Sequence, residues 1–567
     1  MNKLTQLFLE RRGYTDEMLK KIMDPSHPDL MNVDAICEAL KKIHDSQQHI
    51  VVLPDFDMDG ITSGVIGYAG LSELGFTASL YRPTPADGYG FTASTVKELI
   101  QEFPTVKAII TCDVGITCYE GIDYANSQGV QVLVTDHHVQ ESKERLHASV
   151  VVDPNCIDDT YPNKGICGAH VFWQVLQHYA EKYASPFIQS QIYRLRVFAG
   201  MGTISDAMPL VNENRPLVRD SAAICRLLFG EQGLNFLNSL SGCKVYRRAF
   251  WGLHYTLEEF AENGKIQKPE DIDEDFFGFY LAPTFNALKR MNGNMDIGFG
   301  AFFSNNPKDC ASELFAMNEQ RKSAVATYFH EMMTTDQPYA PYVYISEAQP
   351  GILGLLAMKA MTLSGVPTMV LRQDDDSYHG SGRAPVWYQA ITELHPQGFY
   401  IAGHQGAFGI GVKGSDQLKA LHDVLESRVA EIITEMEEQG IKPDCSVEAD
   451  IVIAQNGAGD TAIDIPLLRG YWIDMQRLKP FGRGFEAPKI ELRFDFDQAK
   501  FVTMGSVKQH LKVQLAYGFE ALCWNQSNIV EDLKPGDKLI IDGHLSVSEY
   551  MDTVTLCMIG DIRKDEQ

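Results

Sequence analysis

The sequence predicts an α/β fold that begins with a parallel sheet and ends in a small β-barrel. Three observations lead to this prediction. Between residues 49 and 155, short apolar strands alternate with helical stretches, as in parallel sheets covered by helices on both faces. Each of these strands ends in aspartate or histidine. From about residue 447 the pattern changes to five short strands separated by turn residues, which favours an OB-type barrel.

The strands of the first sheet are expected where β-branched apolar residues cluster. The run Ile50–Leu53 is apolar throughout, as in a strand buried on both faces, and a helix-like segment follows at 61–74. In open parallel sheets, ligands bind beyond the carboxyl ends of the strands. The expected strands cover residues 50–53, 107–111, 130–134 and 149–152, and the barrel strands cover 489–494, 510–515, 520–524, 538–545 and 553–558.

The residues at these strand ends predict a metal site. Three aspartates within five residues follow the first strand, and they repel one another unless a cation lies between them. A solvated acidic loop with helix-capping aspartates is the alternative for this strand alone. Four successive strand ends with carboxylates or imidazoles favour a hard cation, Mg²⁺ or Mn²⁺ rather than zinc. The strand-end residues are Asp55, Asp57, Asp59, Asp113, Asp136, His137, His138 and Asp153.

Length and composition narrow the class of protein. A chain of 567 residues is long enough for three or four domains. The net charge of −26 argues against a surface covered with phosphate-binding patches, but a local basic groove or bound metal can still attract nucleic acid. The eleven cysteines form no CxxC pair, so we expect reduced thiols in the cytoplasm. No apolar stretch approaches 18 residues, so we expect no membrane span and no membrane partner.

The strand-end motifs strongly resemble those of the DHH phosphoesterase superfamily. The resemblance rests on D-F-D-M-D-G at 55–60, D-V-G-I at 113–116 and D-H-H at 136–138, with G-T-I-S-D-A-M-P-L at 202–210 as a fourth element. It implies two ions, Mn²⁺ or Mg²⁺, with Asp113 as the best candidate to bridge them. The implied metal ligands are Asp57, Asp59, Asp113, His137 and Asp206. The implied catalytic residues are Asp55 and Asp136, which orient ligands and hold the tautomer of His137, and His138, which contacts the scissile phosphate or the leaving oxygen.

Three further motifs resemble the RecJ branch of this superfamily. L-A-P-T-F-N-A-L-K-R-M at 281–291 is similar to a motif before a long connecting helix, and G-S-G-R at 380–383 belongs to the expected accessory domain. L-K-P-F-G-R-G at 478–484 precedes the expected barrel, with Phe481 expected to be exposed between two cations. The implied substrate-binding residues are Arg290, Ser381, Gly382, Arg383, Gly403, His404, Lys479, Phe481 and Arg483.

The resemblance covers nearly the whole chain and implies its domains and activity. We expect an α/β protein with a parallel-sheet DHH domain, a long helix, a DHHA1-type α/β accessory domain and a C-terminal OB-type barrel. The implied activity is 5′→3′ hydrolysis of single-stranded DNA to 5′-mononucleotides in DNA repair or recombination. A monomer is expected, with a single-strand-binding protein or a helicase as candidate partners. The expected boundaries are 1–48 for a helical lead-in, then 49–300, 301–338, 339–440 and 441–567.

Three departures from the RecJ pattern keep other functions open. Leu53 stands where some members carry a histidine ligand, and Thr84 and Thr284 stand where arginines are common. One alternative is a DHH phosphodiesterase for short RNA or cyclic dinucleotides, against which the segment 447–567 counts. Another is a non-catalytic scaffold of a replication assembly. Retention of all the implied ligands counts against a scaffold, because an unused carboxylate cluster costs stability.

Overall fold

The computed structural model describes residues 1–24, 26–83, 90–140, 142, 146–439, 449–505, 508–516, 518–550 and 553–565. Thr84 lies outside these ranges. The chain divides into two compact units. The large unit contains residues 27–208 and 217–445, and the small unit contains residues 1–26, 209–216 and 446–567.

The large unit begins with a parallel sheet, as predicted, but this sheet has five strands where four were expected. Its strand order is β2-β1-β3-β4-β5, so β1 lies next to both β2 and β3. β2 is a short strand that the sequence pattern did not predict. The bounds are β1 (His49–Pro54), β2 (Ala78–Leu80), β3 (Val106–Cys112), β4 (Gln131–Thr135) and β5 (Val150–Val152).

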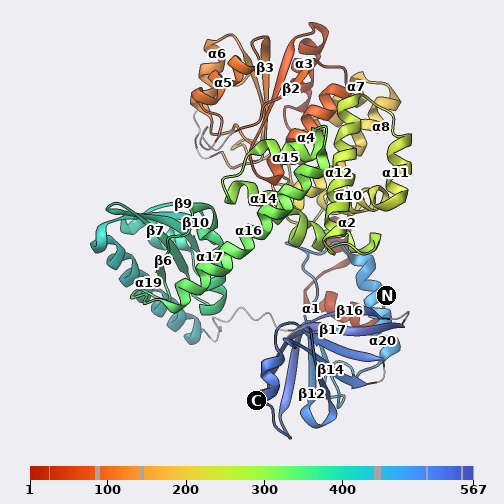
Figure 1. Ribbon diagram of the computed structural model, residues 1–567, viewed down its shortest axis with the longest axis vertical. Coiled ribbons are helices and arrows are strands. Elements are labelled where there is room, and N and C mark those ends of the chain that lie inside the picture. The colour runs from red at the N-terminus through yellow and green to blue at the C-terminus, as the bar shows by residue number, and fades with distance from the viewer. Residues whose placement is uncertain are drawn as a thin grey trace. The chain divides into compact units, whose positions relative to one another are not determined.

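Helices cover both faces of this sheet (Figure 1). Ile50 and Val52 of β1 belong to the core shared with α3, α4 and α7, whereas Val51 and Leu53 belong to the core shared with α5 and α6. This follows from the alternation of side chains along a strand, and it explains why β1 is apolar at every position. The helix bounds are α3 (Val33–Asp45), α4 (Met58–Glu73), α5 (Ala93–Glu102), α6 (Tyr119–Ser127) and α7 (Gly168–Tyr183).

A helical region follows the sheet and leads into a 28-residue helix, α16. A π-helical turn (Phe277–Leu281) precedes α14, which carries the 281–291 motif. The other helices of this region pack around Phe198, Phe250 and Phe302, which extend the apolar core of the sheet. Their bounds are α8 (Pro186–Arg194), α9 (Arg196–Ser205), α10 (Asn214–Leu228), α11 (Gly230–Ser239), α12 (Lys244–Glu262), α13 (Glu274–Phe276), α14 (Ala282–Arg290), α15 (Met295–Phe303) and α16 (Pro307–Thr334).

A second sheet lies in the C-terminal part of the large unit. Its order is β6-β7-β8-β10-β9; the β6–β7 pair is parallel and the others are antiparallel. The bounds are β6 (Val343–Ile345), α17 (Pro350–Ser364), β7 (Thr368–Asp374), β8 (Ser377–Arg383), α18 (Ala390–Leu394), β9 (Tyr400–His404), β10 (Ala407–Lys413) and α19 (Gly414–Glu438).

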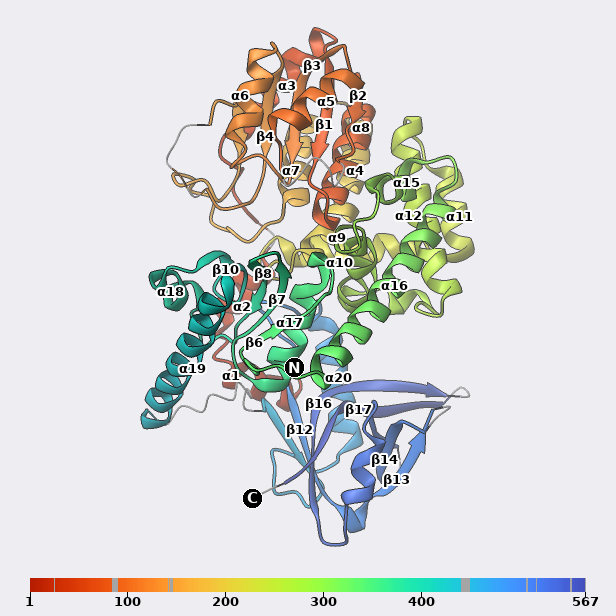
Figure 2. The ribbon, with the colours of Figure 1, turned by 60° about the vertical axis from the view of Figure 1, so that its left-hand side comes forward.

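The small unit contains a seven-stranded sheet in the order β11-β12-β16-β17-β15-β14-β13. Figure 2 labels β12, β13, β14, β16 and β17 of this sheet. Five of its strands match the predicted barrel strands, and β11 and β13 are additional. The bounds are β11 (Ile451–Ala454), β12 (Ile490–Asp495), β13 (Lys500–Met504), β14 (His510–Ala516), β15 (Phe519–Cys523), β16 (Lys538–Tyr550) and β17 (Thr553–Lys564), with helices α1 (Lys3–Arg11), α2 (Asp16–Met23) and α20 (Ile465–Leu478).

The N-terminal segment differs from the single lead-in expected over residues 1–48. Leu4 and Phe8 of α1 are fully buried in the small-unit core with Leu468 of α20. Arg12 also forms a salt bridge with Asp450, whose carboxylate is buried. Residues 1–26 therefore fold with the C-terminal strands, because their apolar face is complementary to α20. Helix α3, in contrast, packs against the first sheet.

Within the described ranges, no helix combines the length and the apolar character needed to cross a bilayer.

Candidate functional site

The strand ends of the first sheet are held in register by backbone hydrogen bonds one residue beyond each strand. The N–H of Asp55 donates to Cys112, that of Asp113 to Thr135, and that of Asp136 to Val152. Asp113 adopts a left-handed backbone conformation with φ of 64°, which is uncommon for a residue other than glycine. Such strain persists where the surrounding structure enforces it, often at a functional site.

Asp113 and His137 meet at the centre of the site. Nε2 of His137 lies 3.1 Å from Oδ1 of Asp113. This oxygen is buried and accepts no hydrogen bond, so the short separation does not have hydrogen-bond geometry. A buried carboxylate oxygen without a donor is costly unless another positive group contacts it. The pair therefore fits a metal ion that both atoms contact.

Asp59 is held by the N-terminus of α7. Its carboxylate accepts the N–H of Gly168 at 2.7 Å and that of Ala169 at 3.2 Å, where the helix dipole favours negative charge. Glycines permit this close approach. A Cβ on Gly168 would lie 2.5 Å from Cβ of Asp113, and one on Gly202 would lie 2.2 Å from Oδ1 of Asp59. Helices α7 and α9 thus enclose the carboxylates because both present glycine there.

Asp57 has two roles. It is the N-cap of α4, and its Oδ1 accepts the N–H of Asp59 at 3.1 Å and of Gly60 at 3.3 Å. The capping interpretation of the acidic loop is therefore correct for this residue. Its other oxygen, Oδ2, faces Lys289 at 3.6 Å and remains available to a cation. Capping and metal binding use different oxygens, so they do not exclude each other.

The structure brings the five predicted ligands together with Asp55 and His138. Within each of three groups, the candidate ligand atoms lie within 4.8 Å of one another. Asp206, at the C-terminal end of α9, joins the strand-end residues in one group. Carboxylate and imidazole ligands suit Mn²⁺ or Mg²⁺. The groups are Asp113, His137 and His138; Asp59, His137 and Asp206; and Asp55, Asp57 and Asp113.

Mutual repulsion and burial alter the ionisation of these residues. Burial, followed by the charge of Asp57, raises the pKa of Asp55 to about 7. Burial and the nearby Asp59 raise the pKa of Asp206 to about 8, and the same causes raise the pKa of Asp113 well above its usual value. Burial lowers the pKa of His137, which keeps the imidazole neutral and able to bind a cation. Without added positive charge the cluster therefore retains protons.

Asp136 orients His138, which corrects the expectation that it holds the tautomer of His137. Oδ1 of Asp136 accepts a hydrogen bond from Nδ1 of His138 at 2.8 Å. The same oxygen accepts the backbone N–H of His137, at 2.7 Å, and not its ring. Oδ2 accepts the N–H of Ile116 at 2.9 Å. The physical reason is geometric: the carboxylate caps the turn after β4, and from there it reaches the ring two residues later.

Two neighbouring elements position the metal residues and were missed at the level of sequence. Asn155 donates from Nδ2 to the carbonyl of His137 at 2.6 Å and so supports that backbone. Asn286 on α14 accepts the N–H of Met58 at 2.9 Å, which anchors the start of α4. Lys289 lies one turn after Asn286, and this i, i+3 spacing was the sequence signal for a shared helix face.

The departures from the family pattern have structural counterparts. Leu53 is buried on β1 among the apolar residues facing α5 and α6, so it offers no ligand. Thr284 accepts Nδ2 of Asn318 at 3.0 Å, and Oδ1 of Asn318 in turn accepts Nε of Arg321 at 3.0 Å. Helix α16 thereby brings Arg321 close to Arg290. Arg321 supplies a positive charge near Thr284, the position at which an arginine is common in the family.

Arg290, Arg321 and Arg383 form a group of cations within the large unit. Burial and then the charges of Arg321 and Arg383 lower the pKa of Arg290, while the carboxylate of Asp57 raises it. Arg383 packs against α17, because a Cβ on Gly354 would lie 2.7 Å from its Nη2. Half-buried guanidinium groups that repel one another are suited to binding a phosphate between them.

The remaining accessory residues lie on the adjacent strands β8, β10 and β9. Ala407 of β10 pairs with both Arg383 and His404, so these two residues lie in one row of the sheet. Ser381 is two residues before Arg383 and therefore shares its face. Gly382 faces the other side, where a Cβ would lie 2.2 Å from the Phe408 ring. Gly403, beside His404, has a φ of 127°.

Phe481 is not the exposed aromatic residue that we expected. Its ring stacks on Phe485 at 5.4 Å and packs against the small-unit core. Arg215 holds this loop, donating to the carbonyls of Leu478 at 2.6 Å and Pro480 at 2.7 Å. The loop packs inward because the guanidinium satisfies its backbone and covers Phe485 at 4.5 Å.

An exposed aromatic residue is found elsewhere in the small unit. Trp524 follows β15, is 49% exposed, and contacts the ring of His510 edge-on at 4.9 Å. Of the three residues chosen in the 478–484 motif, Arg483 is exposed, whereas Lys479 and Phe481 are partly buried. Trp524 is therefore a better candidate for stacking on a base than Phe481.

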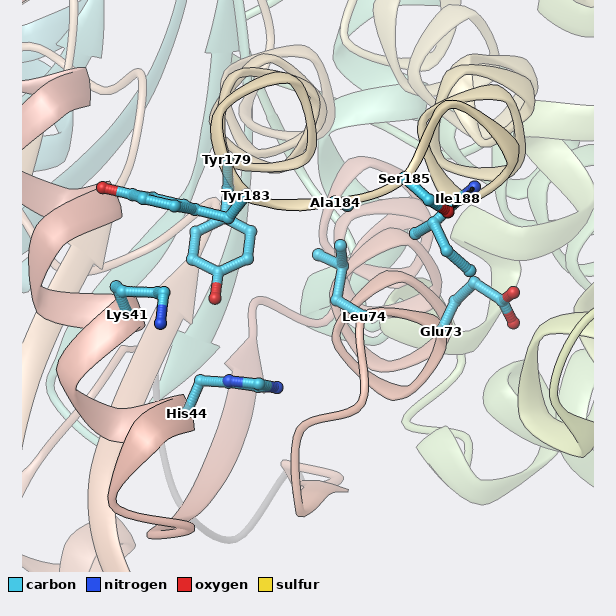
Figure 3. Close-up of a pocket in the computed structure, with 9 residues that line it drawn as sticks. All are labelled: Lys41, His44, Glu73, Leu74, Tyr179, Tyr183, Ala184, Ser185 and Ile188. Carbon is cyan, nitrogen blue, oxygen red and sulfur yellow. Dashed lines mark hydrogen bonds between the residues drawn. The ribbon is translucent and has the colours of Figure 1, made fainter.

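A hollow of about 230 Å³ lies elsewhere in the large unit (Figure 3). Tyr179, Tyr183, Lys41 and His44 line one side of it, and Leu74 projects into it. None of the predicted site residues lines this hollow.

Comparison with known proteins agrees with these features. The model for the DHH family, N-terminal domain, matches residues 49–199, and the model for the RecJ OB domain matches residues 469–559. The single-stranded-DNA-specific exonuclease RecJ of Haemophilus influenzae is 25% identical over 533 residues, covering 88% of this chain and 84% of that protein. The protein of the same name from Salmonella typhimurium is 22% identical, covering 88% and 86%.

A solved structure shows the same fold. The crystal structure of RecJ in complex with Mn²⁺ from Thermus thermophilus has a TM-score of 0.75 and 21% identity, covering 100% of this chain and 76% of that one. The chain thus has a DHH N-terminal domain, a RecJ OB domain and relatives named RecJ along most of its length. Over most of its length the chain is therefore similar to proteins of the RecJ branch of the DHH phosphoesterases.

Proposed function

We propose that this chain is a metal-dependent exonuclease that hydrolyses single-stranded DNA from the 5′ end to 5′-mononucleotides, in DNA repair or recombination. The main support for this proposal is that carboxylates and imidazoles converge on one edge of the first sheet. Among them, Asp113 has a buried oxygen that accepts no hydrogen bond. Relatives named single-stranded-DNA-specific exonuclease supply the substrate class. The small unit matches an OB domain, and domains of this type commonly bind single-stranded nucleic acid.

The residues that would hold the Mn²⁺ or Mg²⁺ ions, two in number by resemblance to the family, are Asp57, Asp59, Asp113, His137 and Asp206. When bound, such ions would supply an activated water and neutralise charge on the phosphoryl oxygens.

The protein's own residues complete the site. Burial lowers the pKa of His138, but the hydrogen bond that its ring donates to Asp136 outweighs this effect and raises the pKa to about 9, so His138 is protonated at neutral pH. We propose that it donates a hydrogen bond to the scissile phosphate or to the leaving oxygen. Asp136 holds this ring in place. Asp55 lies in one group with Asp57 and Asp113, where it would help to hold a cation.

The arginine group would bind the terminal phosphate. Arg290 and Arg383 present bidentate donors, and Ser381 and the glycines around it let the strand approach closely. Arg321 adds positive charge from α16. This arrangement supports the 5′ direction, since a strand end that carries a phosphate binds better than one with a hydroxyl group. A single-strand-binding protein or a helicase as partner, a monomeric state and a cytoplasmic location are part of the same proposal.

The test uses single-stranded DNA labelled at either end, with wild type, Asp113→Ala and the exposed control Asp376→Ala, in Mn²⁺, Mg²⁺ or EDTA. Release of mononucleotides from the 5′ end by wild type and the control, abolished by EDTA and by Asp113→Ala, is expected. Circular dichroism checks that each variant is folded. Cleavage restricted to dinucleotides or short RNA would replace the proposed substrate. Tight DNA binding without cleavage in any metal would leave the scaffold interpretation.

A further inference from the structure

Lys289 lies at the metal site although no strand end carries it. It is on α14, one helical turn after Asn286, whose side chain accepts the N–H of Met58 at 2.9 Å. This hydrogen bond fixes α14 against the first turn of α4. The packing of α14 on α4 therefore places Lys289 beside the carboxylates.

The ammonium group of Lys289 faces the acidic loop. Nζ lies 3.6 Å from Oδ2 of Asp57 and 4.4 Å from the centre of the Phe56 ring. A cation over an aromatic face is attracted to it, which orients the side chain towards this loop.

The lysine also remains accessible. Its side chain is 38% exposed, whereas Asp59 and Asp113 are almost completely buried. The ammonium group of Lys289 is therefore more accessible to a ligand from solution than these two carboxylates are. A lysine ammonium carries three donors on a flexible stem and readily binds a phosphate oxygen as a point charge.

We propose that Lys289 is a further catalytic residue, whose ammonium binds a non-bridging oxygen of the scissile phosphodiester while Phe56 and Asp57 position it. This inference rests on the proposed nuclease function. The positive charge is worth most when negative charge grows on the phosphoryl oxygens, so its effect falls on kcat as well as on KM. No proton is transferred, and Lys289 stays an ammonium throughout.

The competing role is purely structural: the ammonium only offsets the repulsion among the carboxylates. The two roles differ in their effect on metal affinity. If Lys289 binds the phosphate, its removal leaves Mn²⁺ binding unchanged or a few-fold tighter, since a nearby positive charge is lost. If it only stabilises the carboxylate arrangement, its removal disorders the cluster and weakens Mn²⁺ binding.

The experiment compares Lys289→Met, which keeps the stem without the charge, with Lys289→Arg, which keeps the charge. The matched control is Lys359→Met, because Nζ of Lys359 lies over the Phe329 ring at 4.7 Å in the same kind of contact. Each protein is measured for kcat and KM on 5′-phosphorylated single-stranded DNA at saturating Mn²⁺. Mn²⁺ binding without DNA is measured separately by electron paramagnetic resonance.

We expect Lys289→Met to lower kcat/KM by about 10- to 100-fold, with most of the loss in kcat and no loss of Mn²⁺ affinity. Lys289→Arg should recover at least part of the activity, and Lys359→Met should match wild type. Unchanged kcat/KM in Lys289→Met, or a loss that parallels weaker Mn²⁺ binding, would overturn the assignment while leaving the nuclease intact. A wild type that cleaves no DNA would overturn the proposed function and this assignment together.

Discussion

Oδ1 of Asp136 accepts a hydrogen bond from Nδ1 of His138 across 2.8 Å, and the same oxygen accepts the backbone N–H of His138 at 3.2 Å. The carboxylate is buried, whereas the imidazole is 43% exposed. Burial opposes ionisation of both groups, but their mutual attraction prevails, so the pKa of Asp136 is lowered and that of His138 is raised. Asp136 therefore keeps an imidazolium at the open side of the metal residues.

The first prediction concerns this pair. Asp136→Asn removes the charge that holds the proton on His138, so the pKa of His138 should fall from about 9 towards its ordinary value near 6.5. NMR titration of the imidazole in EDTA measures this directly. The same substitution at Asp123, which contacts the exposed His147 at 2.8 Å, is the control and should leave His138 unchanged. If His138 still titrates near 9 in Asp136→Asn, the proposed pairing is wrong.

The second prediction concerns the close approach of α7 to β3. Gly168→Ala places a methyl group 2.5 Å from Cβ of Asp113, so the carboxylate must move. Mn²⁺ affinity should fall by at least about 10-fold, as for the loss of a group that orients a ligand. Gly406→Ala is the control, because its Cβ would meet the nearest atom at an ordinary 3.5 Å. Equal Mn²⁺ affinity in both variants, measured by calorimetry, would show that Asp113 is not constrained in this way.

The third prediction separates two aromatic residues of the small unit. Trp524→Ala should weaken binding of single-stranded DNA by about 5- to 150-fold, since stacking contributes about 1–3 kcal/mol per base. Phe481→Ala should instead destabilise the small unit by about 1–3 kcal/mol, because it removes a partly buried ring that stacks on Phe485. Fluorescence anisotropy with labelled DNA and thermal unfolding measure the two effects. The reverse result would restore Phe481 as the stacking residue.

The fourth prediction concerns pH and stability. Burial and then the charge of Asp136 raise the pKa of Asp153 to about 8, above the roughly 3.9 of an unfolded chain. The folded protein thus binds the proton more tightly, and this contribution to stability is present below about pH 4 and lost as the pH rises through 8. Asp153→Asn abolishes the ionisation. Its Tm relative to wild type should therefore increase from pH 5 to about pH 8 and then level off.

The control for this pH series is Asp376→Asn in an exposed turn, which should follow wild type at every pH. A constant difference in Tm between Asp153→Asn and wild type across the series would mean that Asp153 is already ionised when the protein is folded. Differential scanning calorimetry in metal-free buffer provides all the values.

The first sheet and its metal residues were predictable because their signals are local. An apolar β-branched run such as Ile50–Leu53 indicates a strand buried on both faces, and an acidic residue directly after it must lie at the strand's carboxyl end. Parallel strands bring those ends to one edge, so Asp57, Asp113 and His137 were expected to converge. Asp206 was found only through resemblance to a family motif, since it follows a helix and not a strand.

Tertiary packing determined the side-chain contacts that the local sequence pattern does not specify. Three features depend on such contacts. They are the ring partner of Asp136, the packing of Arg215 over Phe485, on which Phe481 stacks, and the folding of α1 with the C-terminal strands. Lys289 shows the same limit, because its side chain reaches Asp57 only through the packing of α14 on α4. The sequence alone determined the α/β class, the strand ends and the kind of metal they suit. Which side chains touch one another was decided by long-range packing, because burial and hydrogen bonding depend on neighbours that no local pattern specifies.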